Sequence, residues 1–359
     1  MKIFVYNKSM KKYNAAIIGT GRIGFSLGFD KKREKPASHS FALYENSQIN
    51  LVAACDTNLE NLNRWQAKFS KASSFSSIDD FFAYGKTLPS GQFDIVVIAV
   101  NEESHLECAL RAISEKPRLV ILEKPVALNM DEAEKIRLAS EKNGVPILVN
   151  HERRFAEDYK IARLWMDKIG DIQNVNARLY SGLRVYRKED ENTGYYSLIH
   201  DGTHLVDIVL YLLEKLSPDQ RSILKNPKLI NIYKDKDDAV RNLSVHFESE
   251  SCSDVTVSIS GRSRFFAFEI EVTGTEGRII IGNGYARIYR RKESRLYSGF
   301  YSLARWRTVK FPKKTRYFSN MVQNAVDFLD GRCELRSTLQ TGINALSILE
   351  QMKDFILIK

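Results

Sequence analysis

The sequence predicts an α/β protein whose N-terminal part is a doubly wound parallel sheet, followed by a second domain built around another sheet. Two observations predict it. Short apolar runs alternate with helical stretches from residue 14 to 150, which favours parallel strands joined by crossover helices. From residue 151 onward, strand-like segments dominate. At about 150 residues per domain, a chain of 359 residues is long enough for two.

The strands of the first part are expected where Val and Ile cluster in runs as short as a buried strand. These runs are Ala15–Ile18, Leu51–Cys55, Ile95–Val100, Leu119–Leu122 and Ile147–Val149. Helices are expected between them, including 58–69 and 103–114. Ser77 with Asp80, and Asn129 with Glu132, have the spacing of helix N-caps with an acidic third position.

In the second part, several segments alternate apolar and polar residues, which predicts a sheet with one face buried and the other open. The expected strands are 175–180, 229–233, 243–247, 255–259, 265–272 and 278–281. Helices are expected at 156–168, 202–214, 319–329 and 338–358. We therefore expect an extension over residues 1–13, of which 1–9 have little role in the fold, a first domain over 14–150 and a second over 151–359.

Composition excludes several classes of protein. Charged residues make up 27% and apolar residues 43%, as in ordinary globular proteins. No window reaches the roughly 18 apolar residues that span a bilayer, and the N-terminus lacks a secretory signal pattern. The four cysteines show no paired spacing, which favours reduced thiols. We expect a cytoplasmic protein with no membrane partner.

A glycine-rich turn follows the first expected strand: Gly19-Thr20-Gly21-Arg22-Ile23-Gly24. In a dinucleotide-binding turn the first glycine permits the tight bend, the second lets the backbone approach a pyrophosphate, and the third lets helix and strand pack closely. The turn is expected to open a helix whose N-terminus carries the pyrophosphate.

The second strand ends at Asp56, which is placed to accept hydrogen bonds from the adenosine ribose. Its distance from the glycine turn exceeds the usual spacing of about 20 residues. We attribute the excess to an exposed insertion around residues 30–40. No arginine follows Asp56 to receive a 2′-phosphate, so the sequence favours NAD over NADP.

Five stretches in the expected order resemble the glucose–fructose oxidoreductase / inositol dehydrogenase (Gfo/Idh/MocA) family, and the resemblance covers nearly the whole chain from residue 14. They are Ile98-Ala99-Val100-Asn101 with His105, Leu122-Glu123-Lys124-Pro125, Val149–Phe155, Asp201–Asp207 and Glu271–Gly277. Asn101 stands where the family usually has proline. The resemblance implies a nicotinamide-binding Rossmann domain, then an α/β domain with an open, mostly antiparallel sheet.

The resemblance also implies roles for individual residues. Val100, Asn101, His105, Glu123 and Lys124 would border the cofactor, with Lys124 touching both substrate and cofactor ribose. His204 would be the base that takes the substrate proton, a task for which the ordinary pKa of imidazole, about 6.5, is suited.

One departure leaves the proton route open. Many family members have aspartate four residues before the catalytic histidine, whereas this chain has His200 there and Asp201 one place later. On a helix, positions 200 and 204 share a face, so either imidazole can be the base. Arg153, Arg154 and Asp201 are candidate substrate contacts. No constellation of metal ligands is complete, so we expect no metal site.

The excess of positive charge is local. Eleven lysines and arginines lie between Arg287 and Arg316, opposed only by Glu293, and the net charge of the whole chain is +10. Three interpretations stay open, in this order: a solvated loop and edge strand, a site for an anionic small substrate such as a nucleotide sugar, and a nucleic-acid surface.

The sequence thus favours an NAD-dependent dehydrogenase acting on a CH–OH group of a sugar, cyclitol or nucleotide sugar, as a homodimer or homotetramer. The alternative is a regulatory protein that senses a nucleotide on the same fold without turnover, which the histidine at position 200 keeps open.

Overall fold

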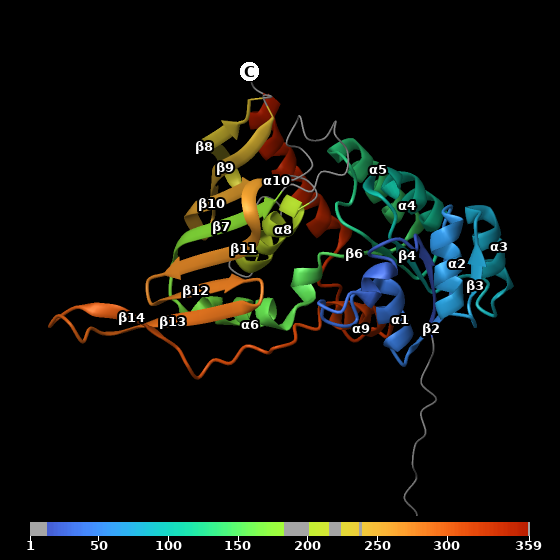
Figure 1. The fold of residues 1–359 in the computed structure, drawn as a ribbon, viewed down its shortest axis with the longest axis horizontal. Coiled ribbons are helices and arrows are strands. Elements are labelled where there is room, and N and C mark those ends of the chain that lie inside the picture. Colours follow the sequence, from blue (N-terminus) through green and yellow to red (C-terminus); the bar gives the residue numbers. More distant parts are fainter. Residues whose placement is uncertain (1–12, 183–200, 215–223, 237–238, 358–359) are drawn as a thin grey trace, which may run out of the picture. The chain divides into compact units, whose positions relative to one another are not determined.

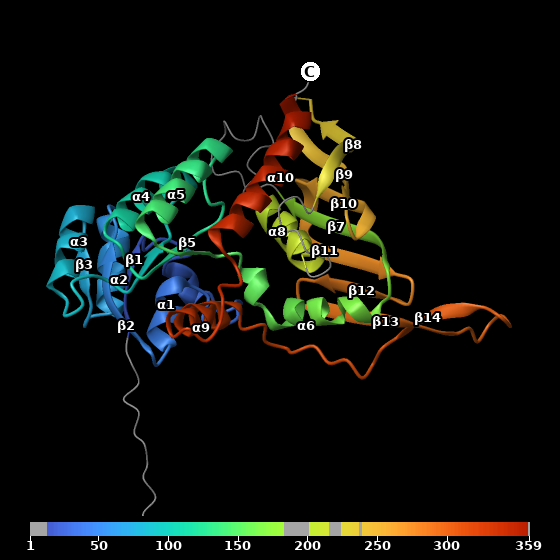
Figure 2. The same ribbon diagram turned by 180° about the vertical axis from the view of Figure 1, so that it is seen from behind.

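A computed structural model describes residues 13–182, 201–214, 224–236 and 239–357. They form two compact units, which Figures 1 and 2 show from opposite sides. The first unit comprises the chain up to Glu123, then Glu134–Asn150 and Phe318–Thr338. The second comprises Lys124–Ala133, His151–Tyr317 and the chain from Leu339 onward. His200 and residues 1–9, named above, lie outside the described residues.

The first unit contains a six-stranded parallel sheet in the order β3-β2-β1-β4-β5-β6. This is the strand order of a Rossmann fold, so the predicted doubly wound sheet is confirmed. The strands are β1 (Tyr13–Ile18), β2 (Ile49–Cys55), β3 (Ser73–Phe75), β4 (Ile95–Ile98), β5 (Leu119–Leu122) and β6 (Ile147–Val149). β3 has no apolar run, and the sequence did not predict it.

Helices connect these strands as the parallel arrangement requires. They are α1 (His39–Glu45), α2 (Leu59–Lys68), α3 (Ile78–Thr87), α4 (His105–Ser114) and α5 (Met130–Asn143). Both predicted caps form: the Asp80 amide donates to Ser77 Oγ at 3.3 Å, and the Glu132 amide donates to Asn129 Oδ1 at 2.9 Å.

The second unit is built on an eight-stranded sheet in the order β14-β13-β12-β11-β7-β10-β9-β8. β7 and β10 pair in parallel and the other neighbours are antiparallel, as predicted. The strands are β7 (Ile172–Gly182), β8 (Lys225–Lys234), β9 (Val240–Ser249), β10 (Cys252–Ser260), β11 (Arg262–Gly274), β12 (Gly277–Gly282), β13 (Tyr285–Glu293) and β14 (Tyr301–Arg305). The last two overlap the stretch rich in lysine and arginine between Arg287 and Arg316, which we call the basic segment.

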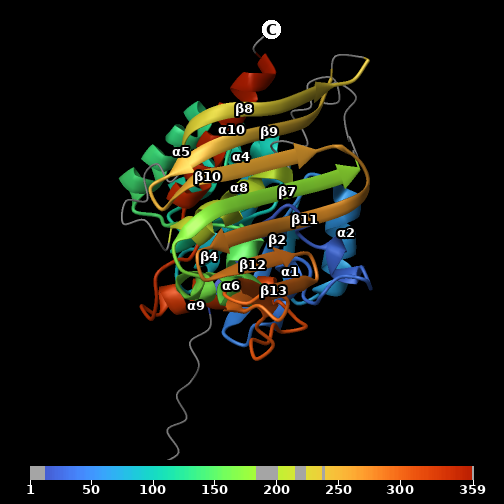
Figure 3. The same cartoon turned by 90° about the vertical axis from the view of Figure 1, so that its left-hand side faces the viewer.

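Figure 3 views this sheet with the helices of its own unit behind it. These helices are α6 (Glu157–Trp165), α8 (Gly202–Leu213) and α10 (Leu339–Leu357). Alternate residues of β9 and β10, such as Val245 and Val257, are fully buried, which agrees with the predicted half-buried pattern. Short 3₁₀ helices occupy Ser26–Phe29, Glu102–Ser104, Glu152–Phe155 and Met166–Lys168.

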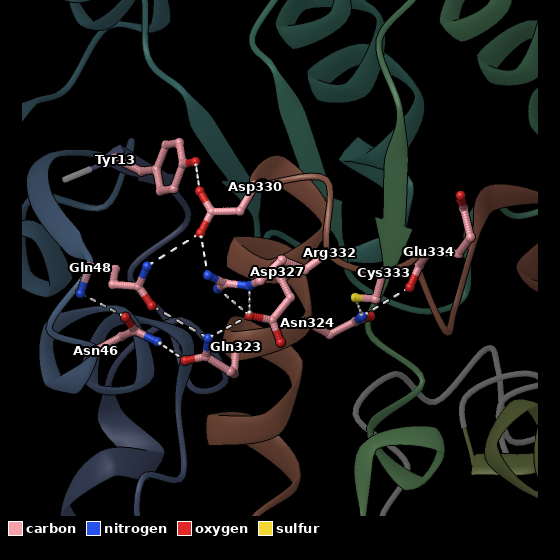
Figure 4. A network of polar contacts seen from close by, with 10 residues as sticks. All are labelled: Tyr13, Asn46, Gln48, Gln323, Asn324, Asp327, Asp330, Arg332, Cys333 and Glu334. Atoms are coloured by element: carbon pink, nitrogen blue, oxygen red, sulfur yellow. Dashed lines mark hydrogen bonds and ion pairs between the residues drawn. The ribbon is translucent and has the colours of Figure 1, made fainter. Parts of the chain in front are cut away.

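Helix α9 (Tyr317–Leu329) and the turn after it join the first unit, although the sequence assigns them to the second domain. Figure 4 shows the polar contacts that hold them. The Tyr13 hydroxyl donates to Asp330, and Asn46 Nδ2 donates to Gln323 Oε1 at 3.1 Å. The Arg118 guanidinium lies over the Tyr13 ring and donates to a carbonyl at the end of α9. The first unit therefore takes material from both halves of the chain.

Candidate active site

The glycine turn lies at the carboxyl end of β1, and its three glycines have different surroundings. Gly19 has a φ of +96°, and a Cβ there would lie 2.4 Å from the Ala99 carbonyl oxygen. A Cβ on Gly24 would lie 2.1 Å from the Gly19 oxygen. A Cβ on Gly21 would meet nothing within 4 Å. Two glycines are thus required by packing, whereas Gly21 leaves open space above the backbone.

The turn does not lead directly into an α-helix, which corrects the expectation from sequence. Residues 22–25 form turns, a 3₁₀ helix follows, and α1 begins only at His39. The amides of His39 and Ser40 nevertheless donate to the carbonyls of Ile23 and Gly24, at 3.1 and 3.0 Å. Through these two bonds, helix α1 continues the helical hydrogen bonding of the glycine turn. The residues between the turn and α1 are therefore an insertion. It begins earlier in the sequence than predicted.

Asp56, just after β2, is held against the glycine turn. Its Oδ2 accepts hydrogen bonds from the amide and the hydroxyl of Thr20, each at 2.7 Å. Its Oδ1 accepts one from the Asn58 amide at 2.8 Å. A carboxylate offers about four acceptor positions, so about one remains for a ribose hydroxyl. The open space at Gly21 and this remaining acceptor fit an adenine dinucleotide, which Thr20 and Asp56 would hold.

The loop after β4 lies beside the turn, because β1 and β4 are neighbours at the point where the strand order reverses. In open α/β sheets, ligands bind outside the carboxyl ends of the strands at this point. Asn101 is exposed and Val100 partly so. His105 is buried, and its Nε2 lies 3.3 Å from the Val100 carbonyl oxygen. One ring nitrogen of His105 therefore contacts the backbone of the loop.

A buried polar cluster surrounds Glu123. Its Oε1 lies 2.6 Å from His39 Nε2 and accepts a hydrogen bond from Asn150 Nδ2 at 2.6 Å. All three residues are at most 5% exposed, and the His39 ring meets Phe318 edge-on. The partners of the Glu123 carboxylate, His39 and Asn150, therefore lie in the first unit. These contacts fix the chain immediately before Lys124.

Sequence patterns did not single out His39 or Asn150. His39 lies 84 residues before Glu123, and nothing in the local pattern links the two. A signal does exist for Asn150: it follows β6 at the carboxyl edge of the sheet, where polar side chains gather around a ligand site.

The candidate catalytic residues Lys124 and His204 belong to the second unit. His204 lies in the first turn of α8, and every other residue from Gly202 to Leu213 is buried. The imidazole is half-buried and Lys124 is partly exposed. Asp201 precedes the helix, is partly exposed, and makes no capping hydrogen bond with its side chain.

Arg154 is a structural residue, which corrects its assignment as a substrate contact. Its side chain is 1% exposed and donates through Nε to Asp207 Oδ1 at 2.7 Å and through both terminal nitrogens to Glu214 at 2.9 Å. Burial would raise the pKa of Asp207, but Arg154 and His151 outweigh it and lower that pKa. Arg153 differs: it is partly exposed and stacks on Phe268 at 4.0 Å.

His200 lies outside the described residues, so its place beside His204 stays a prediction. Within the described ranges, no group of three or more His, Cys, Asp or Glu side chains could hold a metal ion. The candidate residues are therefore divided between the units: residues 19–24 and Asp56 lie in the first, and Lys124 and His204 lie in the second.

Comparison with known proteins agrees with this geometry. Residues 13–151 match the Gfo/Idh/MocA family, an oxidoreductase family with an NAD-binding Rossmann fold. The inositol 2-dehydrogenase of Salmonella typhimurium is 25% identical over 197 residues, which are 51% of this chain and 56% of that protein. The yeast regulatory protein GAL80 is 25% identical over 220 residues, which are 55% and 48% of the two chains.

The match therefore spans about half the length of these curated relatives. Among solved structures, the WlbA dehydrogenase of Bordetella pertussis, in complex with NADH and UDP-GlcNAcA, has a similar fold. Its TM-score is 0.72 at 17% identity, over 96% of this chain and 95% of the other. Residues 13–151 of this chain are therefore similar to the Gfo/Idh/MocA oxidoreductase family, which has an NAD-binding Rossmann fold.

Proposed function

We propose that the chain is an NAD-dependent dehydrogenase acting on a CH–OH group of a sugar, cyclitol or nucleotide sugar. The observation that carries the proposal is the glycine turn, with open space at Gly21 and the Asp56 carboxylate beside it. The family match of the first domain and the inositol dehydrogenase relative support the reaction class.

The proposed reaction removes a hydride from the substrate carbon and a proton from its hydroxyl. The cofactor, when bound, accepts the hydride. His204 takes the proton, because it is the one side chain of α8 that is not buried. Lys124 donates hydrogen bonds to the substrate oxygen as its charge develops, and Glu123 holds the chain that carries it. His200 is the alternative base.

We propose NAD rather than NADP because a carboxylate, not a cation, lies where the adenosine ribose would bind. A 2′-phosphate would face the negative charge of Asp56, which Thr20 holds in place. Fluorescence titration with NADH and NADPH tests this choice. Tighter binding of NADPH would overturn it.

The enzyme is tested by following NADH absorbance with a panel of sugars, cyclitols and nucleotide sugars. Loss of a general acid or base lowers kcat by roughly 10²- to 10⁴-fold, so Lys124→Ala and His204→Ala should each show such a fall. The matched controls Lys135→Ala, on α5, and His246→Ala, on β9, should retain wild-type turnover. If both site variants turn over like the wild type, the assigned residues are wrong.

The alternative function is a nucleotide-sensing regulator, which the similarity to GAL80 supports. It predicts NADH binding without turnover on any substrate of the panel. For both the dehydrogenase and the regulator we propose a homodimer or homotetramer. Sedimentation velocity measures this oligomeric state.

A further inference from the structure

The basic segment that the sequence left open forms a hairpin at the edge of the second unit's sheet. β13 and β14 pair from Tyr289 with Arg305 to Glu293 with Tyr301. Figures 1 and 2 show this hairpin extending beyond the other strands of the sheet. Its base is anchored by Trp306, whose ring meets Trp165 edge-on at 4.6 Å and lies under the Arg290 guanidinium. We call residues 290–307 the basic hairpin.

The tip of the basic hairpin is apolar, ordered by its own contacts, and open to solvent. Leu296, Tyr297 and Phe300 are 81%, 67% and 66% exposed. The Ser294 amide donates to the Phe300 carbonyl, and Ser294 Oγ accepts from the amides of Leu296 and Tyr297. The rings of Tyr297 and Phe300 meet edge-on at 6.1 Å. The fold thus presents three apolar side chains to water at one point.

Positive charge lies beside this tip and along the two strands behind it. The basic hairpin carries six cationic side chains and one acidic one, Glu293. The cations are Arg290, Arg291, Lys292, Arg295, Arg305 and Arg307, all of them exposed. Only for Arg291 does the described structure record an ion pair, with Glu276 at 2.7 Å, so most of the charge stays available to an external partner. The partner must therefore be anionic and must accept apolar side chains at its surface.

We propose that the basic hairpin docks the protein on an anionic lipid bilayer, with its tip in the interfacial region and its cations against the headgroups. Apolar side chains at a tip with basic residues behind them have the arrangement of interfacial anchors. Long basic side chains can place their charges at headgroup level while their stems lie along apolar surface.

The sequence predicts no membrane partner, because no segment is long and apolar enough to span a bilayer. The proposed attachment departs from that prediction and needs no spanning segment. None of the described helices combines the length and apolar composition needed to cross a membrane. The proposal depends on neither cofactor binding nor turnover, so it stands apart from the proposed dehydrogenase.

Two other occupants fit less well. Single-stranded nucleic acid would stack its bases on open aromatic rings. The most exposed apolar side chain of the hairpin is instead the aliphatic Leu296, and the rings of Tyr301 and Trp306 already lie under the guanidinium groups of Arg291 and Arg290. A second copy of this chain would bring no surplus of negative charge, because the chain as a whole is positive and is close to neutral outside the basic segment.

Co-sedimentation with vesicles tests the proposal, using phosphatidylcholine alone and phosphatidylcholine mixed with phosphatidylglycerol. At low salt the wild type should bind the mixed vesicles and not the neutral ones. Lys292→Gln with Arg295→Gln should weaken binding about 30-fold, because each basic residue contributes about 1 kcal/mol near an anionic surface, a factor of about five. Lys135→Gln with Lys142→Gln, exposed on α5, is the matched control and should bind like the wild type.

The apolar tip is tested by Leu296→Ser with Phe300→Ser, which should also weaken binding. The matched control is Leu138→Ser with Leu164→Ser, two exposed leucines elsewhere. A Leu296→Trp variant should shift its fluorescence to the blue on anionic vesicles. The proposal is overturned by equal binding to neutral vesicles, by tip and control variants that bind alike, or by no shift. Tight binding to oligo-dT without vesicle binding would assign the hairpin to single-stranded nucleic acid. Dissociation of a lipid-free oligomer by the tip variant would assign it to a second copy of this chain.

Discussion

Replacement of Arg154 by methionine should destabilise the second unit strongly at neutral pH. The guanidinium is buried, and it pairs with Asp207 and with both oxygens of Glu214. Methionine fills much of the same volume but leaves two buried carboxylates with less positive charge beside them. Breaking a buried pair in this way costs about 3–5 kcal/mol of unfolding free energy.

The unfolding free energy lost in Arg154→Met should also depend on pH. The contacts of Asp207 determine whether the loss grows or shrinks as the pH rises. In the wild type the pKa of Asp207 is lowered, so its contribution to stability is present above its unfolded pKa, near 4, and is lost on acidification. Without Arg154, burial is opposed only by His151, and the pKa of Asp207 should rise above its unfolded value. In the variant, the contribution of Asp207 to stability would then be present at low pH and lost as the pH rises. The loss of unfolding free energy caused by Arg154→Met should therefore be smaller at pH 5 than at pH 7.

Urea denaturation at both pH values measures this effect. A Trp65→Phe background leaves the fluorescence of Trp165 and Trp306, which both lie in the second unit. Arg137→Met, which removes two ion pairs with exposed glutamates on α5, is the matched control and should change little. A penalty for Arg154→Met that is equal at the two pH values, or no larger than that of the control, would refute the assignment of Arg154 as a buried counter-ion.

Two further predictions concern the first unit. Gly24→Ala should lower both the melting temperature and the affinity for NADH, because its Cβ would lie 2.1 Å from a carbonyl oxygen. Gly21→Ala should lower only the affinity for NADH, because its Cβ would meet no protein atom within 4 Å. A lowered melting temperature for Gly21→Ala would contradict this. Burial raises the pKa of Cys55 to about 12 and that of Cys108 to about 11, so a thiol reagent at pH 8 should modify the exposed Cys333 first. Because these pKa values are raised, the two thiols stabilise the fold below pH 8.5, near the unfolded pKa, and this contribution should fade as the pH rises through 11 to 12. Rapid modification of Cys55 at pH 8 would show that it is not buried.

The sequence predicted those parts of the fold that depend on local pattern. Runs of Val and Ile mark β1, β4 and β5, since a strand buried on both faces needs apolar residues throughout. The glycine turn was predicted because its steric requirements fall on adjacent residues. What the pattern missed depends on long-range contacts: the 3.6-residue period predicts helix α9 but not that Tyr13 and Asp330 join it to the first unit.

Adjacent residues of the same type show the same limit within the site. Arg153 and Arg154 were equivalent candidates, because charge and position along the chain do not distinguish them. The structure distinguishes them through Asp207 and Glu214, which lie more than 50 residues away and accept hydrogen bonds from all three guanidinium nitrogens of Arg154. His39 was likewise missed, since its partner Glu123 comes from a distant strand end.

The residues proposed for function are recognised in the structure as exceptions to burial. Folding gains free energy by removing apolar side chains from water, so a partly open position within a buried run stays accessible to a ligand. His204 is such an exception in α8, where its neighbours from Gly202 to Leu213 are buried. Gly21 is the exception among the three glycines of its turn, because only there would a Cβ meet no protein atom. The proposed function gives both positions a role: a dinucleotide would approach the backbone at Gly21, and a substrate would reach the imidazole of His204.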